Sequence, residues 1–150
     1  MENFEPVITA FCCNYCGYAA ADLAGSMRAQ YPSNIRIIKV PCTGKIDIIY
    51  ILKSLESGVD GVYLVGCKEG NCHFINGNIR ARKRVERAKY ILGQIGIEKE
   101  RVEMYNMSAG EGTRFVKAAI EMTENIRKLG PIPIGRKRAM NKGFNQRERI

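Results

Sequence analysis

Four short apolar segments, each followed by a segment with helical periodicity, constrain the fold of this chain most strongly. The strand-like segments are PVITAF (6–11), IRIIKV (35–40), GVYLV (61–65) and VEMYNM (102–107). After each one, apolar residues recur at steps of three and four, which is typical of one face of a helix. These apolar positions are Ala20, Leu23, Ala24 and Met27; Ile48, Leu52 and Leu55; Ala81, Val85, Ala88, Leu92 and Ile95; and Phe115, Ala119, Met122, Ile126 and Leu129. Strand and helix alternating four times predict an α/β domain with a parallel sheet.

The composition of the strands predicts their order. The first and third segments are almost continuously apolar, as expected for central strands, whereas the second and fourth carry Arg36, Lys39 and Glu103 and suit the edges. We therefore expect a four-stranded parallel sheet in the flavodoxin-like order 2-1-3-4, with helices on both faces. Residues 1–130 would form this domain. Residues 131–150 lose periodicity and gain Pro, Gly and charge, which predicts an irregular basic C-terminal tail that a partner orders.

The net charge of +9 is concentrated in two places. Residues 76–95 and residues 131–150 each carry six basic side chains and one acidic one, and the rest of the chain is nearly neutral. One basic helix and one basic tail favour docking to proteins over binding to nucleic acid, since few aromatic residues are interleaved with the charges. No secretion signal opens the chain, and no apolar run approaches the ~20 residues of a membrane span. We expect a soluble, cytoplasmic protein.

Six cysteines carry the chemistry: Cys12, Cys13, Cys16, Cys42, Cys67 and Cys72. In a reducing compartment they indicate thiolate chemistry and not a disulfide framework. Five of them follow the first three strands, and the carboxyl ends of parallel strands share one edge of the sheet, so these five should converge. Cys12 precedes Cys13 in the strand and points to the other side, where we expect it to be a small buried hydrophobe.

The spacing of the cysteines favours an iron–sulfur cluster but leaves two alternatives open. A structural zinc site usually brings two Cys-x-x-Cys pairs, whereas here Cys67-x4-Cys72 follows a single such pair. A redox dithiol would leave the other cysteines unexplained. A zinc-stabilised adaptor or nucleic-acid-binding module and a dithiol oxidoreductase therefore remain. His73 is expected to make a supporting hydrogen bond or to face solvent. Ser108-x-x-Glu111 has the spacing of a capping box and predicts the start of the last helix.

Four motifs in order resemble a known family: CNYCGYAAADLAG, RIIKVPCTGK, DGVYLVGCKEGNCHFINGN and RVEMYNMSAGEGTRF. They are similar to the delta, iron–sulfur subunit of the methyl-viologen-reducing (deazaflavin-non-reducing) hydrogenase of methanogenic archaea, and the resemblance covers residues 7–129. It implies an electron-transfer subunit, not itself catalytic, with a 2Fe–2S cluster held by four of five cysteines. The family's cysteines fall on Cys13, Cys16, Cys42, Cys67 and Cys72.

The same resemblance implies the partners. Electrons would come from the small subunit of a hydrogenase, or from a formate dehydrogenase. They would pass to the flavin-containing subunit of heterodisulfide reductase, in an electron-bifurcating complex of methanogenesis.

Overall fold

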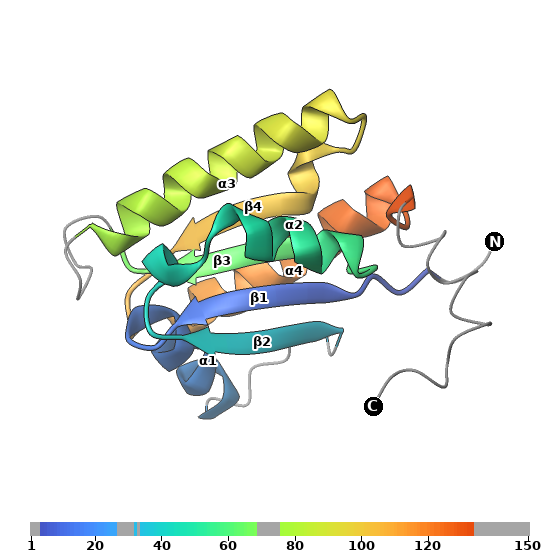
Figure 1. The fold of residues 1–150 in the computed structure, drawn as a ribbon. Helices are drawn as coiled ribbons and strands as arrows, with labels where there is room; N and C mark the ends of the chain where they lie inside the picture. Colours follow the sequence, from blue (N-terminus) through green and yellow to red (C-terminus); the bar gives the residue numbers. More distant parts are fainter. Residues whose placement is uncertain (1–3, 27–31, 33, 69–75, 134–150) are drawn as a thin grey trace, which may run out of the picture.

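The computed structural model describes residues 4–26, 32, 34–68 and 76–133. Its elements alternate between strands and helices as the sequence predicts (Figure 1). In chain order they are β1 (Ile8–Cys13), α1 (Cys16–Ser26), β2 (Ile35–Val40), the 3-10 turn η1 (Thr43–Lys45), α2 (Ile48–Glu56), β3 (Gly61–Gly66), α3 (Gly77–Gln94), the 3-10 turn η2 (Lys99–Arg101), β4 (Val102–Asn106) and α4 (Gly112–Leu129).

The strands form one parallel sheet in the order β2-β1-β3-β4, which confirms the predicted fold class. Every residue of β1 and β3 is buried, whereas β2 and β4 include partly or fully exposed residues, as the mixed composition of the edge strands indicated. The register aligns the strand ends, because Cys13 pairs with Val40 and Gly66 pairs with Asn106. Segments that follow β1, β2 and β3 therefore leave the sheet at a common edge.

Two layers of helices cover the two faces of the sheet (Figure 1). Helices α1 and α4 share one apolar cluster with the strand residues Ala10, Cys12 and Tyr63. Helices α2 and α3 share the other cluster with Phe11 and Leu64. Neighbouring strand residues thus alternate between the two layers, as extended backbone requires. No helix in the described part of the chain is both long and apolar enough to cross a membrane.

The end of α3 differs from the prediction. Ile95 was expected on the buried face, yet it is 61% exposed, because the helix ends at Gln94. Gly96 adopts a φ of 79°, which turns the chain out of the helix, and Ile97 fills the core position instead. Met27, expected on the buried face of the first helix, lies outside the described residues.

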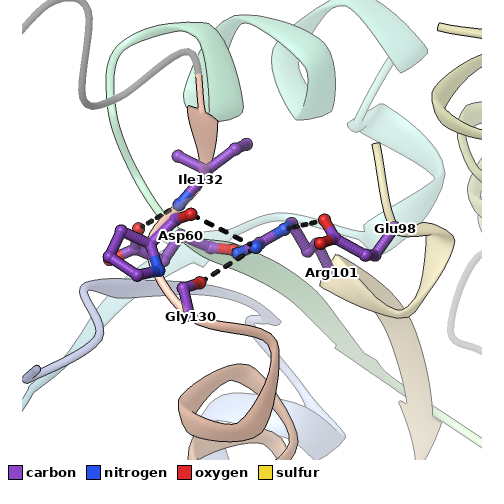
Figure 2. Close-up of polar contacts among 6 residues, drawn as sticks. Asp60, Glu98, Arg101, Gly130 and Ile132 are labelled. Atoms are coloured by element: carbon purple, nitrogen blue, oxygen red, sulfur yellow. Dashed lines mark hydrogen bonds and ion pairs between the residues drawn. The ribbon is translucent and has the colours of Figure 1, made fainter. Parts of the chain in front are cut away.

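A buried arginine links the segments that precede β3 and β4 to the end of the described chain (Figure 2). Arg101 is fully buried, and its guanidinium donates to the carbonyls of Asp60 at 3.0 Å and Gly130 at 2.9 Å and to the Glu98 carboxylate at 2.8 Å. The Asp60 carboxylate in turn accepts from the backbone N–H of Ile132 at 3.0 Å. Ile132 is fully buried in the layer of α2 and α3, so the packed part of the chain extends at least to this residue.

Candidate metal centre at the carboxyl edge of the sheet

Two cysteine side chains meet where β1 and β3 end, and a third cysteine begins the helix beside them. Cys13 is the last residue of β1 and Cys67 directly follows β3, and their Sγ atoms lie 3.7 Å apart. Cys16 begins α1, and its side chain lies close enough to Cys67 to affect the pKa of that thiol. Sulfurs at the corners of a tetrahedron with metal–sulfur bonds of about 2.3 Å lie roughly 3.8 Å apart. The Cys13–Cys67 separation therefore fits two ligands of one tetrahedral metal ion.

Cys42 lies at the same edge, in the loop after β2. It follows Val40 by two residues, and the Val40 carbonyl accepts from the backbone N–H of Asn14 at 2.7 Å, in the turn that leads to Cys16. The Cys42 thiol is buried and accepts from the N–H of Gly44 at 3.4 Å. It borders a cavity of about 400 Å³ that is also lined by Lys45, Asn76, Gly77 and Arg80.

The remaining predicted residues are not placed. Cys72 and His73 lie outside the described residues. Within the part of the chain that the structure describes, no three Cys, His, Asp or Glu side chains form a group that could hold a metal ion, and the five cysteines there form no disulfide. The close Cys13–Cys67 pair, with Cys16 beside it, is thus not a complete ligand set by itself.

Burial dominates the electrostatics of the paired thiols. It raises the pKa of both Cys13 and Cys67 above the ordinary value, and the hydrogen bond from Gly17 N–H to Cys13 Sγ at 3.0 Å offsets only part of this effect on the Cys13 pKa. A redox dithiol acts through a thiolate whose pKa is lowered. The pKa values of Cys13 and Cys67 are thus shifted in the opposite direction from that of such a thiolate.

Cys12 takes no part in this cluster. It is fully buried on the face covered by α1 and α4, in the same layer as Tyr63 and Phe115, while its neighbour Phe11 packs in the opposite layer. Burial raises the pKa of the Cys12 thiol to about 12. The prediction that Cys12 is a small core residue is confirmed.

The start of α4 is linked to the Cys67 loop. Glu111 accepts from the backbone N–H and from the hydroxyl of Ser108, both at 2.9 Å. The predicted capping box is wrong, however, because α4 begins only at Gly112, its N-cap is Glu111 and no side chain caps the helix. The same carboxylate pairs with Lys68 at 2.8 Å. Helix α4 therefore begins beside the residue that follows Cys67.

Two asparagines that the sequence analysis did not single out hold the backbone of Cys67. The side-chain amides of Asn78 and Asn106 donate to its carbonyl at 2.9 Å and 2.7 Å. Asn78 is 1% exposed and precedes Ala81 and Val85 at helical spacing, so it lies on the buried face of α3. A polar residue at a position of the apolar stripe was the feature that could have revealed it, because buried amides need partners.

Comparisons with known proteins identify the family of this chain. The family model described as "Methyl-viologen-reducing hydrogenase, delta subunit" matches residues 8–130. The chain is 50% identical over 130 residues to the vhu iron-sulfur subunit of the F420-non-reducing hydrogenase of Methanocaldococcus jannaschii, an alignment that covers 87% of this chain and 97% of that protein. It is also 50% identical over 128 residues to the protein of the same name from Methanopyrus kandleri, which covers 85% of this chain and 97% of the relative.

A third relative is much longer. The chain is 41% identical over 127 residues to one subunit of the ferredoxin:CoB-CoM heterodisulfide reductase of Methanosarcina mazei. That alignment covers 85% of this chain but 16% of the relative, so a sequence of this kind forms part of a larger polypeptide there. Two findings decide the classification. The family model matches most of the chain, and the chain is similar to the shorter relatives along nearly their whole length. The chain belongs to the family of delta subunits of methyl-viologen-reducing hydrogenases.

Proposed function

We propose that this protein is a non-catalytic electron-transfer subunit that holds a 2Fe–2S cluster at the carboxyl edge of its sheet. Four of the five cysteines Cys13, Cys16, Cys42, Cys67 and Cys72 are its ligands. The observation that carries the proposal is the approach of Cys13 and Cys67 to 3.7 Å with Cys16 beside them. The relatives named as iron-sulfur subunits support an iron–sulfur cofactor in this chain as well.

The backbone around the cysteines suits this cofactor. The N–H groups of Gly17 and Gly44 point at the sulfurs of Cys13 and Cys42, at 3.0 Å and 3.4 Å. Such hydrogen bonds stabilise the negative charge of thiolate ligands and raise the reduction potential of an iron–sulfur cluster. When bound, the cluster supplies reversible one-electron chemistry, and the protein supplies its ligands and local electrostatics.

We further propose that electrons reach this protein from the small subunit of a hydrogenase or from a formate dehydrogenase. They leave to the flavin-containing subunit of heterodisulfide reductase, in an electron-bifurcating complex of methanogenesis. The relative from Methanosarcina mazei supports the second contact, because there a sequence of this kind is joined to a heterodisulfide reductase subunit in one polypeptide.

The cluster is tested by metal and acid-labile sulfide analysis of anaerobically purified protein, with visible spectra before and after dithionite. We expect two irons and two sulfides per chain and a spectrum that bleaches on reduction. Four irons per chain would contradict the cluster type. One zinc without sulfide or colour would refute the electron carrier and favour the zinc-stabilised adaptor.

A test of the direction of electron flow requires the assembled complex. With the hydrogenase partner bound, hydrogen gas should bleach the cluster absorbance, and added heterodisulfide reductase with its substrate should restore it. A complex in which hydrogen leaves the cluster oxidised would contradict the proposed relay, even if the isolated chain contains iron and sulfide.

A further inference from the structure

Helix α3 contacts the loops of two candidate ligands at once. In its first turn, the Asn78 side-chain amide donates to the carbonyls of Cys67 and Lys68, each at 2.9 Å. Two turns further on, the Arg84 guanidinium donates to the carbonyls of Gly44 and Ile46, the latter at 3.1 Å. Figure 1 shows that α3 begins at the edge where the arrows of β1 and β3 end. One helix is therefore bonded both to the loop after β2 and to the loop after β3.

The contact with Cys67 fixes its backbone. A carbonyl oxygen has two lone pairs, and the Cys67 oxygen accepts from two amides that come from different elements, Asn78 in α3 and Asn106 at the end of β4. The peptide plane after Cys67 can then rotate only if one of these buried bonds breaks. The direction in which the Cys67 side chain leaves the backbone is fixed with it.

The contact with the Cys42 loop is close and direct. A Cβ atom on Gly44 would lie 2.7 Å from the Cα of Gly77, so the start of α3 lies against this loop with no side chain between them. Gly44 is also the residue whose N–H donates to the Cys42 sulfur at 3.4 Å. Arg84, which holds the Gly44 carbonyl, therefore acts on the same peptide segment that contacts Cys42.

We propose that α3 positions Cys42 and Cys67 relative to each other, with Arg84 and Asn78 as the positioning residues. The inference rests on the proposed function, because it concerns ligands of the proposed centre. It also separates Arg84 from the other basic residues of α3. Arg84 is half-buried and bonded to the Cys42 loop, whereas Arg80, Lys83 and Arg87 are exposed.

The test compares cluster loss from full-length variants in the presence of an iron chelator, followed by the decay of visible absorbance. Arg84→Met and Asn78→Ala should lose the cluster on the order of 10-fold faster than the unaltered chain, as is typical when a group that orients a metal ligand is removed. Arg84→Lys keeps a donor for the carbonyls and should recover part of the difference. Arg87→Met removes the same charge from an exposed position of the same helix and should match the unaltered chain.

A second control separates positioning from general stability. Val85→Ala creates a cavity under α3 without removing either contact, since Val85 is buried in the layer of α2 and α3. It should lower the melting temperature and leave the electron paramagnetic resonance spectrum of the reduced cluster unchanged. Arg84→Met and Asn78→Ala should change that spectrum. If Arg84→Met and Asn78→Ala have the same spectrum and the same rate of cluster loss as Arg87→Met, the inference is overturned while the proposed function stands.

A measurement on the metal-free chain distinguishes the positioning by α3 from the proposed function. In the metal-free chain, the rate at which iodoacetamide alkylates Cys42, followed by peptide mass spectrometry, should rise in Arg84→Met, because the loop that buries this thiol is released. If the unaltered chain takes up no iron, the proposed function fails, and the inference about ligands fails with it. If Arg84→Met leaves the alkylation rate of Cys42 unchanged and the iron content is normal, the inference about α3 fails and the proposed function stands.

Discussion

The sulfur atoms of Cys13 and Cys67 lie 3.7 Å apart although 54 positions separate the two residues along the chain. Their approach results from the pairing of β1 with β3 as parallel neighbours. No local segment of the sequence could bring them together. Changes to the cysteines at this edge should therefore affect metal binding most directly.

Replacing the paired cysteines should abolish the centre. Cys13→Ser and Cys67→Ser each remove one sulfur of the pair, and we expect iron and sulfide per chain to fall to a small fraction of the normal content. Cys12→Ala is the matched control, because Cys12 is buried in the core between the sheet and helices α1 and α4. It should keep its iron and lose roughly 1–3 kcal/mol of unfolding free energy, a common cost of a core substitution. Full iron content in Cys67→Ser would contradict the assignment.

Gly17 should not tolerate a side chain. A Cβ atom there would lie 2.4 Å from the carbonyl oxygen of Val65, so α1 would have to move away from β3 and weaken the N–H contact to Cys13. We expect Gly17→Ala to cost about 1–3 kcal/mol of stability and to reduce iron content. Gly25→Ala, in the same helix with no atom within 4 Å of the new Cβ, should be neutral or stabilising. Urea unfolding of both variants checks this, and equal stabilities would contradict it.

Arg101 should be a strong determinant of stability. Arg101→Met leaves the buried carbonyl of Asp60 and the partly buried carbonyl of Gly130 without their donor, and we expect a loss of roughly 2–4 kcal/mol in unfolding free energy. Arg127→Met breaks an exposed pair with Glu5, whose atoms lie 3.5 Å apart, and should change stability by about 0.5 kcal/mol or less. Denaturant titrations compare the two. A loss in Arg101→Met no larger than that in Arg127→Met would show that the buried contacts contribute little.

Glu111 should add an acid-sensitive component to stability. The hydrogen bond with Lys68, followed by those from Ser108, lowers the pKa of Glu111 to about 2. Because this value lies below that of the unfolded chain, the stabilisation is complete above the unfolded pKa of about 4.5 and disappears as the pH falls toward about 2. Over that window the melting temperature of the metal-free chain should fall more steeply than that of Glu111→Gln. Lys68→Met should weaken the same dependence, and parallel curves for all three would count against this role.

The exposed basic side chains of α3 should matter for assembly and not for the cluster. In the double variant Arg82→Glu and Lys83→Glu, we expect normal iron content but loss of co-purification with the hydrogenase partner, most clearly at moderate salt, where the remaining attraction is screened. Arg84 is left in place because it holds the Cys42 loop. Arg114→Glu, on the exposed surface of α4, is the control for a reversed charge. Normal assembly of the double variant at low and moderate salt would refute docking through α3.

The fold could be predicted from the sequence because each element carries its own pattern. Continuous apolar runs identified the two central strands, and mixed runs such as that around Arg36 and Lys39 identified an edge. Once the sheet is parallel, residues such as Cys13 and Cys67 that follow adjacent strands must share an edge, so part of the site followed from the topology.

The parts that could not be predicted depend on partners distant in sequence. Arg101 lies in the charged stretch IEKER, which is typical of a solvated turn, and its burial depends on carbonyls from residues 60 and 130. Arg84 resembles its exposed neighbours in sequence, yet its guanidinium reaches the Cys42 loop. Such roles require two elements to be packed together before they can be recognised, and no local periodicity contains that information.

The contacts of Arg101 and Asp60 also set where the chain leaves the domain. Asp60 directly precedes the six-residue strand β3 and Cys67 directly follows it. At about 3.3 Å per residue, the two lie roughly 23 Å apart along the strand. A protein that binds the residues after Pro133 would therefore contact the domain at the end of the sheet away from the cysteines. We therefore expect a partner bound to the tail and a partner bound beside the cysteines to contact opposite ends of this domain.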